Sequence, residues 1–125
     1  MTVIEEQLKQ LLEHHPETAI TALPDGSTLL AVPKIRIPPG WNLAEGTIAF
    51  IVPAGFPTAR PDCFWTDAPL LLANGGQPAN SNPQMPPGGT TLMRWFSWHL
   101  QTWLPNRDTV YTYLDFCVAR FRDCR

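Results

Sequence analysis

The first segment of the chain distributes its apolar residues with the period of an α-helix. Thr2 and Glu5 have the spacing of a capping box, and Pro16 would stop a helix that begins there. The residues that fall on one face at helical spacing are Ile4, Leu8, Leu11, Leu12 and His15. The pattern therefore predicts a helix over residues 2–15.

Strand-like runs follow, each bounded by turn residues. They cover residues 19–23, 28–37, 46–52 and 62–66, and are separated by Pro, Gly, Asp and Asn. Pro33 inside the second run indicates an edge position or a β-bulge, because proline has no N–H for a sheet ladder. Short turns between neighbouring runs favour a four-stranded antiparallel meander.

The character of the chain changes between residues 67 and 91. Pro and Gly recur through the second half of this stretch, with Asn80, Ser81 and Asn82 among them. A connector this long without secondary structure is uncommon in a compact domain, and such loops are often functional. We therefore expect a long irregular loop with a role in a site.

A second helix is predicted at residues 109–122, with Asp108 as its N-cap. Its core-facing stripe consists of Val110, Tyr113, Leu114, Cys117, Val118 and Phe121. Helices segregated from an antiparallel sheet define an α+β fold. The length of 125 residues fits a single domain over residues 1–125.

Composition and charge narrow the class of protein. Hydrophobic residues make up 44% of the chain and charged residues 16%, as in globular domains. A net charge of -2 gives no basis for a nucleic-acid or membrane surface. The N-terminal segment lacks the apolar region of a signal peptide, and three scattered cysteines predict neither a disulfide framework nor a metal site. We expect a cytoplasmic protein that uses no cofactor.

Trp95, Trp98 and Trp103 place three of the five tryptophans close together, with Ser97 and His99 among them. Large aromatic side chains usually belong to a core. A hydroxyl and an imidazole between them also form a candidate reactive site. The residues by themselves leave both interpretations open.

Three local motifs are Phe-Pro-Thr-Ala-Arg-Pro at residues 56–61, Cys-Phe-Trp-Thr at 63–66 and Trp-Leu-Pro at 103–105. Together with the order of elements, they resemble the ubiquitin-conjugating (E2, UBC-like) family. Residues 56–61, Phe-Pro-Thr-Ala-Arg-Pro, are similar to the family's Tyr-Pro-x-x-x-Pro signature. Residues 63–66, Cys-Phe-Trp-Thr, fall where the family has a strand ending in Phe-x-Thr. Residues 103–105, Trp-Leu-Pro, resemble its Trp-Ser-Pro segment. The resemblance implies a UBC-like fold, with the loop at residues 67–91 as its active-site segment.

Two further motifs are similar to diverged bacterial E2-like proteins found beside E1-like adenylating enzymes and ubiquitin-like proteins. They are residues 64–70, Phe-Trp-Thr-Asp-Ala-Pro-Leu, and the aromatic element at residues 93–99. The implied partners are an E1-like adenylating enzyme, a ubiquitin-like protein and a target protein, and antiphage defence is one implied setting. The first helix would then contact the E1-like enzyme through Glu5, Gln7, Lys9 and Gln10.

The sequence departs from the E2 pattern at the expected nucleophile. It has no His-Pro-Asn motif, and no cysteine lies between Cys63 and Cys117. Ser97, six residues before Trp103, is the nucleophilic side chain nearest to the place of the E2 cysteine. A serine would carry the ubiquitin-like protein as an oxyester and would need a base, for which His99 is the candidate.

Other residues have supporting or competing roles in this hypothesis. His99 shares a face with Ser97 if their segment is extended, but not if it is helical. Cys63 is the alternative nucleophile, Cys117 is expected to be buried and inert, and Cys124 to be incidental. The side chains expected to stabilise the site or a developing oxyanion are Arg94, Asn80, Asn82, Trp95, Trp98 and Trp103.

Two functions follow from the resemblance. The first is an E2-like carrier that accepts a ubiquitin-like protein from an E1-like enzyme and transfers it to a target, with Ser97 and His99 as catalytic residues. The alternative is a catalytically inactive E2 variant that binds a ubiquitin-like protein or an E1-like partner. A third interpretation is an unrelated α+β structural or phage-type protein with the same order of elements.

Overall fold

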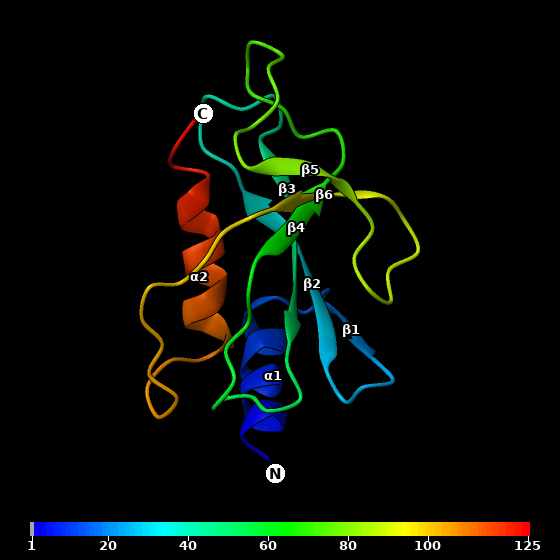
Figure 1. Cartoon of the computed structure of the whole chain (residues 1–125), viewed down its shortest axis with the longest axis vertical. Helices are drawn as coiled ribbons and strands as arrows, with labels where there is room; N and C mark the ends of the chain where they lie inside the picture. The colour runs from blue at the N-terminus through cyan, green and yellow to red at the C-terminus, as the bar shows by residue number, and fades with distance from the viewer. Residues whose placement is uncertain (1) are drawn as a thin grey trace.

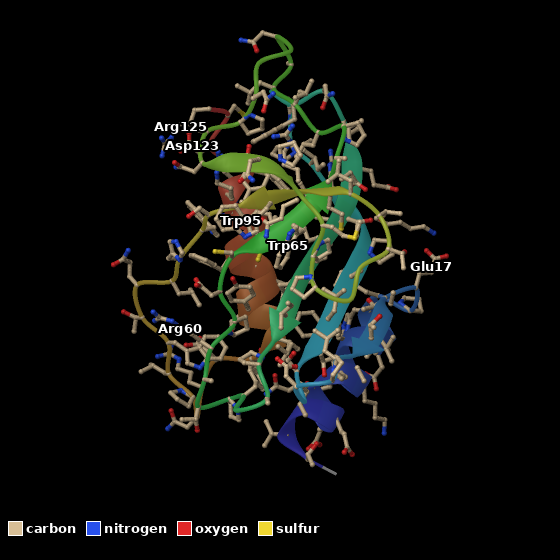
Figure 2. All side chains as sticks on the ribbon, turned by 45° about the vertical axis from the view of Figure 1, so that its right-hand side comes forward. Glu17, Arg60, Trp65, Trp95, Asp123 and Arg125 are labelled. Carbon is tan, nitrogen blue, oxygen red and sulfur yellow. The ribbon has the colours of Figure 1, made fainter. Side chains whose placement is uncertain are left out.

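A computed structural model describes residues 2–125, so the first residue of the predicted 1–125 domain lies outside the described part. A six-stranded antiparallel sheet has the order β1-β2-β3-β4-β6-β5, and two helices cover one of its faces (Figures 1 and 2). The elements in chain order are α1 (Val3–His14), β1 (Ala19–Ala22), β2 (Thr28–Arg36), β3 (Glu45–Val52), β4 (Phe64–Asp67), β5 (Ser81–Gln84), β6 (Met93–Phe96) and α2 (Val110–Arg120).

The main core lies between the sheet and the two helices. Alternate residues of the central strands point to this side, as their period of two requires. Phe64 and Phe96, opposite each other in β4 and β6, stack with ring centroids 5.1 Å apart. The helices contribute the remaining fully buried side chains, chiefly Leu11, Val110, Tyr113, Cys117 and Phe121. The stripe predicted for the second helix therefore faces the core.

A second, smaller apolar cluster occupies the opposite face of the sheet. Trp65 in β4 pairs with Trp95 in β6, and Figure 2 shows the two indoles side by side. The loop between β5 and β6 extends toward β1, where Gly88, at φ +75°, approaches the side chain of Leu23. A Cβ at Gly88 would collide with Leu23, so a glycine is needed at this contact. Trp95 is thus a packing residue on the side away from the helices.

The α+β class and the first four strands agree with the sequence prediction, but the strand count does not. The predicted irregular stretch 67–91 contains β5, and β6 follows at residues 93–96. Both extend the sheet beyond β4, but not as a continued meander, because β6 pairs with β4 and β5 lies outside β6; the sheet therefore has six strands instead of four. Ser81–Gln84 includes Pro83 and has little strand propensity, so the strand depends on its pairing with β6.

Pro33 marks a β-bulge, one of the two outcomes that its position predicted. The register between β2 and β3 shifts between Val32 and Ile35, and Lys34 has a φ of 59°. β2 is not an edge strand, because it lies between β1 and β3. The bulge accommodates a proline within a central strand.

The helix termini differ in detail from the prediction. Thr2 caps α1 as expected by accepting a hydrogen bond from the N–H of Glu5. Thr109, not Asp108, caps α2, in a capping box with Thr112. The Asp108 carboxylate instead accepts from the N–H of Leu104 at 2.8 Å, which closes the preceding turn. The helix ends at Arg120, two residues before the predicted position 122.

Gln7 is half-buried and does not belong to a free solvent face of α1. Its side-chain oxygen accepts a hydrogen bond from the N–H of Val110 at 2.9 Å, which satisfies an otherwise free donor at the start of α2. The other three residues of that face, Glu5, Lys9 and Gln10, are exposed as expected. Along residues 2–125, we find no helix with both the length and the apolar character needed to cross a membrane.

Candidate functional site

The start of β4 and the segment after β6 are joined through the backbone of Cys63. Its N–H donates to the carbonyl oxygen of Trp98 at 3.1 Å, and its own carbonyl accepts from the hydroxyl of Tyr113 in α2 at 2.6 Å. Cys63 also has a φ of 57°, a left-handed conformation that non-glycine residues seldom adopt. These constraints bring Asp62 beside residues 97–99.

Ser97, His99 and Asp62 form a continuous hydrogen-bonded chain. Ser97 Oγ lies 3.1 Å from His99 Nε2, and His99 Nδ1 lies 2.7 Å from Asp62 Oδ1. A carboxylate can only accept, so Nδ1 carries the proton in this pairing and Nε2 is left as an acceptor. The serine hydroxyl can then donate to Nε2, which is the arrangement needed for proton removal by a general base.

The segment from Ser97 to His99 is not helical, which is the condition that the sequence set for the two side chains to share a face. Residues 97–99 are not helical, so Ser97 and His99 at positions i and i+2 face each other. Ser97 is half-buried, whereas the side chains of His99 and Asp62 are 57% and 62% exposed. A site this open suits a macromolecular reactant better than a small molecule enclosed in a pocket.

Cys63 also faces this group, but its thiol is poorly suited to nucleophilic attack. The residue is buried, and its Sγ lies 4.0 Å from His99 Nδ1. Burial raises the pKa of the Cys63 thiol, a hydrogen bond to the thiol from the backbone of Trp98 opposes the rise, and the charge of Asp62 adds to it. Since the thiolate is the reactive form, burial and the charge of Asp62 make the Cys63 thiol less reactive than an exposed one.

The residues expected to donate to an oxyanion, Asn80, Asn82 and Arg94, differ in whether they contact Ser97. The backbone oxygen of Asn80 accepts from the N–H of Ser97 at 2.9 Å, so this N–H is already engaged. The side chain of Asn80 is exposed on the same loop. Asn82 lies in β5 opposite Trp95, and its amide contacts the carbonyl of Pro83. Of Asn80, Asn82 and Arg94, Asn80 is the one that is hydrogen-bonded to the Ser97 backbone.

Arg94 is a structural residue rather than a neighbour of the Ser97 hydroxyl. Its side chain is buried, with Nη1 3.1 Å from Ser81 Oγ and 3.4 Å from Gln77 Oε1. Burial lowers the pKa of its guanidinium. These contacts hold the start of β5 and the residues just before it against β6.

Arg120 supports the loop that carries Asn80. Its guanidinium is buried over the rings of Trp41 and Phe96 and donates to backbone carbonyls of Ala79, Asp123 and Arg125 at 2.6–3.0 Å. The N–H of Ala79 donates in turn to the carbonyl of Arg125 at 3.0 Å. Figure 2 shows the C-terminal segment, labelled at Asp123 and Arg125, beside this loop. Arg120 therefore holds the residue before Asn80 in place.

Trp98 and Trp103 frame the site from the helix side. Trp98 stacks on Phe116 at 5.2 Å, and its Nε1 donates to the Phe116 carbonyl at 2.9 Å. Trp103 Nε1 donates to the carbonyl of Pro57 at 2.7 Å. The Trp-Leu-Pro and Phe-Pro motifs, distant in sequence, thus contact each other.

The remaining cysteines play no part in the site. All three cysteines are free, with Cys117 buried and Cys124 exposed. Burial raises the pKa of the Cys117 thiol well above its usual value.

The sequence pointed to Ser97, His99 and Cys63 but missed Asp62 and Arg120. Asp62 appeared only as the first residue of a predicted strand. The register between β4 and β6 would have revealed it, because the pairing of Phe64 with Phe96 places the residues before β4 beside those after β6.

One known protein family matches most of the chain. A family model, prokaryotic E2 family E, matches residues 5–122. The chain belongs to this family, and its α+β fold is the UBC-like fold. Searches of curated proteins and of solved structures found no match.

Proposed function

We propose that the protein is an E2-like carrier that holds a ubiquitin-like protein on Ser97 as an oxyester. Membership of prokaryotic E2 family E supports the carrier role. The observation that carries the choice of residue is the chain from Ser97 Oγ through His99 to Asp62, with distances of 3.1 and 2.7 Å. The partners in this proposal are an E1-like adenylating enzyme, a ubiquitin-like protein and a target protein.

Loading begins when the E1-like enzyme presents the activated C-terminal carbonyl of the ubiquitin-like protein. Ser97 Oγ attacks this carbon while His99 Nε2 takes the hydroxyl proton. The bond from the carbonyl to the E1 leaving group breaks, and His99 returns its proton to that group. Asp62 stabilises the imidazolium that forms in between and keeps Nδ1 protonated.

Transfer reverses the roles of the same groups. An amine or hydroxyl of the target attacks the ester carbonyl and loses a proton to His99. The bond to Ser97 Oγ breaks, and the serine oxygen leaves with the proton from His99. The exposed amide of Asn80 is the candidate donor to the oxyanion in both steps.

The test is a loading assay with an E1-like enzyme and a processed ubiquitin-like protein from the same bacterium, together with ATP. The expected product is a covalent adduct that survives thiol reductant but is cleaved by hydroxide or hydroxylamine. Ser97→Ala should abolish it, whereas Cys63→Ala and the matched hydroxyl control Thr102→Ala should retain it. A reductant-sensitive adduct lost in Cys63→Ala would assign the nucleophile to Cys63.

The alternative is the catalytically inactive E2 variant, which would bind a ubiquitin-like protein or an E1-like partner without becoming acylated. It is favoured by the lack of a cysteine between Cys63 and Cys117. Complex formation without any adduct in the same assay would select this function.

A further inference from the structure

A second set of donor atoms overlaps the Ser97 site. Asp62 and Cys63 precede β4, and His99 follows β6, yet a carboxylate oxygen, a sulfur and an imidazole nitrogen of these residues all lie within 4.8 Å of one another. The Sγ of Cys63 lies 4.0 Å from Nδ1 of His99.

We propose that Asp62, Cys63 and His99 bind a zinc ion. Thiolate, imidazole and carboxylate are the three ligand types that proteins use for Zn²⁺, and three protein ligands leave a fourth position for water. Cysteine makes the set unsuited to Mg²⁺ or Ca²⁺, which prefer oxygen ligands alone.

The three donor atoms lie within 4.8 Å of one another, close to the spacing around a single ion. Zinc bonds are about 2.3 Å to sulfur and about 2.0–2.2 Å to nitrogen or oxygen. The 4.0 Å between Cys63 Sγ and His99 Nδ1 is shorter than the sum of two such bonds, so an ion fits between these atoms. Asp62 Oδ1 is 2.7 Å from the same nitrogen and needs to move outward by a fraction of an ångström.

The backbone of one ligand, Cys63, is held in place, whereas the side chains of Asp62 and His99 are exposed. The backbone of Cys63 is held on both sides by Trp98 and Tyr113. The exposed side chains of Asp62 and His99 have room to turn toward the ion if the hydrogen bond between them is given up. Binding converts the Cys63 thiol to a thiolate and releases one proton to water, while Asp62 and neutral His99 keep their charges.

Zinc binding and the proposed serine chemistry exclude each other, a consequence that rests on the proposed function. In the Ser97 arrangement, Nδ1 of His99 carries the proton and Nε2 accepts from the serine. Coordination takes the lone pair of Nδ1, so the proton must lie on Nε2. Nε2 then donates to Ser97 Oγ and can no longer take its proton. Zinc would therefore block loading.

Metal binding is tested on the isolated protein, without any ubiquitin-like chemistry. Titration with Co²⁺ should produce a thiolate-to-cobalt charge-transfer band at one ion per chain, and Zn²⁺ should displace it. The band should be lost in Cys63→Ala and kept in Cys124→Ser. Absence of a band in the unmodified protein, or a band that depends on Cys124, would overturn the site.

The inhibitory consequence is tested by loading in the presence of Zn²⁺ and after addition of a chelator. The ratio of rates with and without zinc is compared within each variant, with the same E1-like enzyme. Zinc should slow loading at least tenfold in the unmodified protein, and a chelator should restore it, whereas Cys63→Ala should be less sensitive. Equal inhibition of both proteins would overturn the consequence. Failure of all loading would refute the proposed function and leave the cobalt result intact.

Discussion

The carboxylate of Asp62 lies 2.7 Å from Nδ1 of His99, although the two residues are 37 positions apart in the chain. The pairing of β4 with β6 brings them together. Because the carboxylate selects the protonated form of Nδ1, it decides which nitrogen of His99 faces Ser97. Asp62 is thus a positioning residue for the proposed reaction.

Asp62→Asn should slow adduct formation about 10- to 100-fold, which is part of the 10²–10⁴-fold that a positioned general base contributes. The amide can donate to Nδ1 and stabilise the wrong tautomer. Since the residue is exposed, the free energy of unfolding should change by less than about 0.5 kcal/mol. Single-turnover loading with a chelator present measures the first effect, and urea denaturation the second. Asp115→Asn, on the exposed side of α2, is the matched control, and an equal loss in both variants would refute the role.

Tyr113→Phe should lower the free energy of unfolding by about 1–3 kcal/mol. The substitution keeps the buried ring but removes the 2.6 Å hydrogen bond to the Cys63 carbonyl, which is left without this donor. Because the same bond fixes the residue after Asp62, loading should also slow. Urea denaturation and the loading assay measure the two effects. An unchanged stability would show that the Cys63 carbonyl finds another donor.

Alkaline pH should destabilise the protein, and Tyr113 should account for part of the effect. Burial raises the pKa of the Tyr113 hydroxyl and of the Cys117 thiol above their unfolded values, which are about 10 and 8.5. The stability due to these groups is complete below the unfolded pKa values and falls as pH rises above them, because the unfolded chain then loses protons that the folded chain retains. Urea denaturation at about pH 8 and about pH 10.5 measures the difference. The pH dependence should be smaller in Tyr113→Phe; an identical dependence would contradict this assignment.

Arg120→Met should destabilise the fold by about 3 kcal/mol, because it leaves the carbonyls of Ala79, Asp123 and Arg125 without a charged donor. It should also slow loading, since the loop at Asn80 loses its anchor. Chemical denaturation and the loading assay report the two losses. The control is Arg122→Met on the exposed tail of the helix, which should remain close to the unmodified protein. Equal effects of the two substitutions would argue against the anchoring role.

Thiol alkylation should distinguish the three cysteines. Cys124 is exposed and should react first with iodoacetamide, whereas Cys63 and Cys117, 7% and 0% exposed, should react only after much longer times or in denaturant. Peptide mass spectrometry gives the order. Rapid labelling of Cys63 in the native protein would show that its thiol is more accessible than the structure indicates.

Local periodicity was sufficient for the parts of the fold that are determined locally. The apolar stripes predicted both helices, and the capping role of Thr2 follows from residues three positions apart. The capping box of α2 was missed because Asp108 is an equally good N-cap by type. The choice of Thr109 depends on Thr112 and on the use of Asp108 in the preceding turn.

Non-local pairing explains what the sequence did not reveal. Ser81–Gln84 lacks β-branched and aromatic residues, and becomes a strand because β6 supplies its partners. Ser97 and His99 are close in sequence and could be proposed together. Asp62 and Arg120 act across 37 and 41 positions, to His99 and Ala79 respectively, so no local pattern connects them to the site.

Pro83 in β5 bears on how the edge of the sheet is protected. β5 is an edge strand of the sheet. The unpaired backbone N–H and C=O groups of an edge strand can bind a strand from another molecule. Proline offers no N–H to an incoming chain, and the strand is only four residues long. The short strand and its proline therefore make backbone pairing with a second molecule less favourable at the edge nearest the proposed Ser97 site.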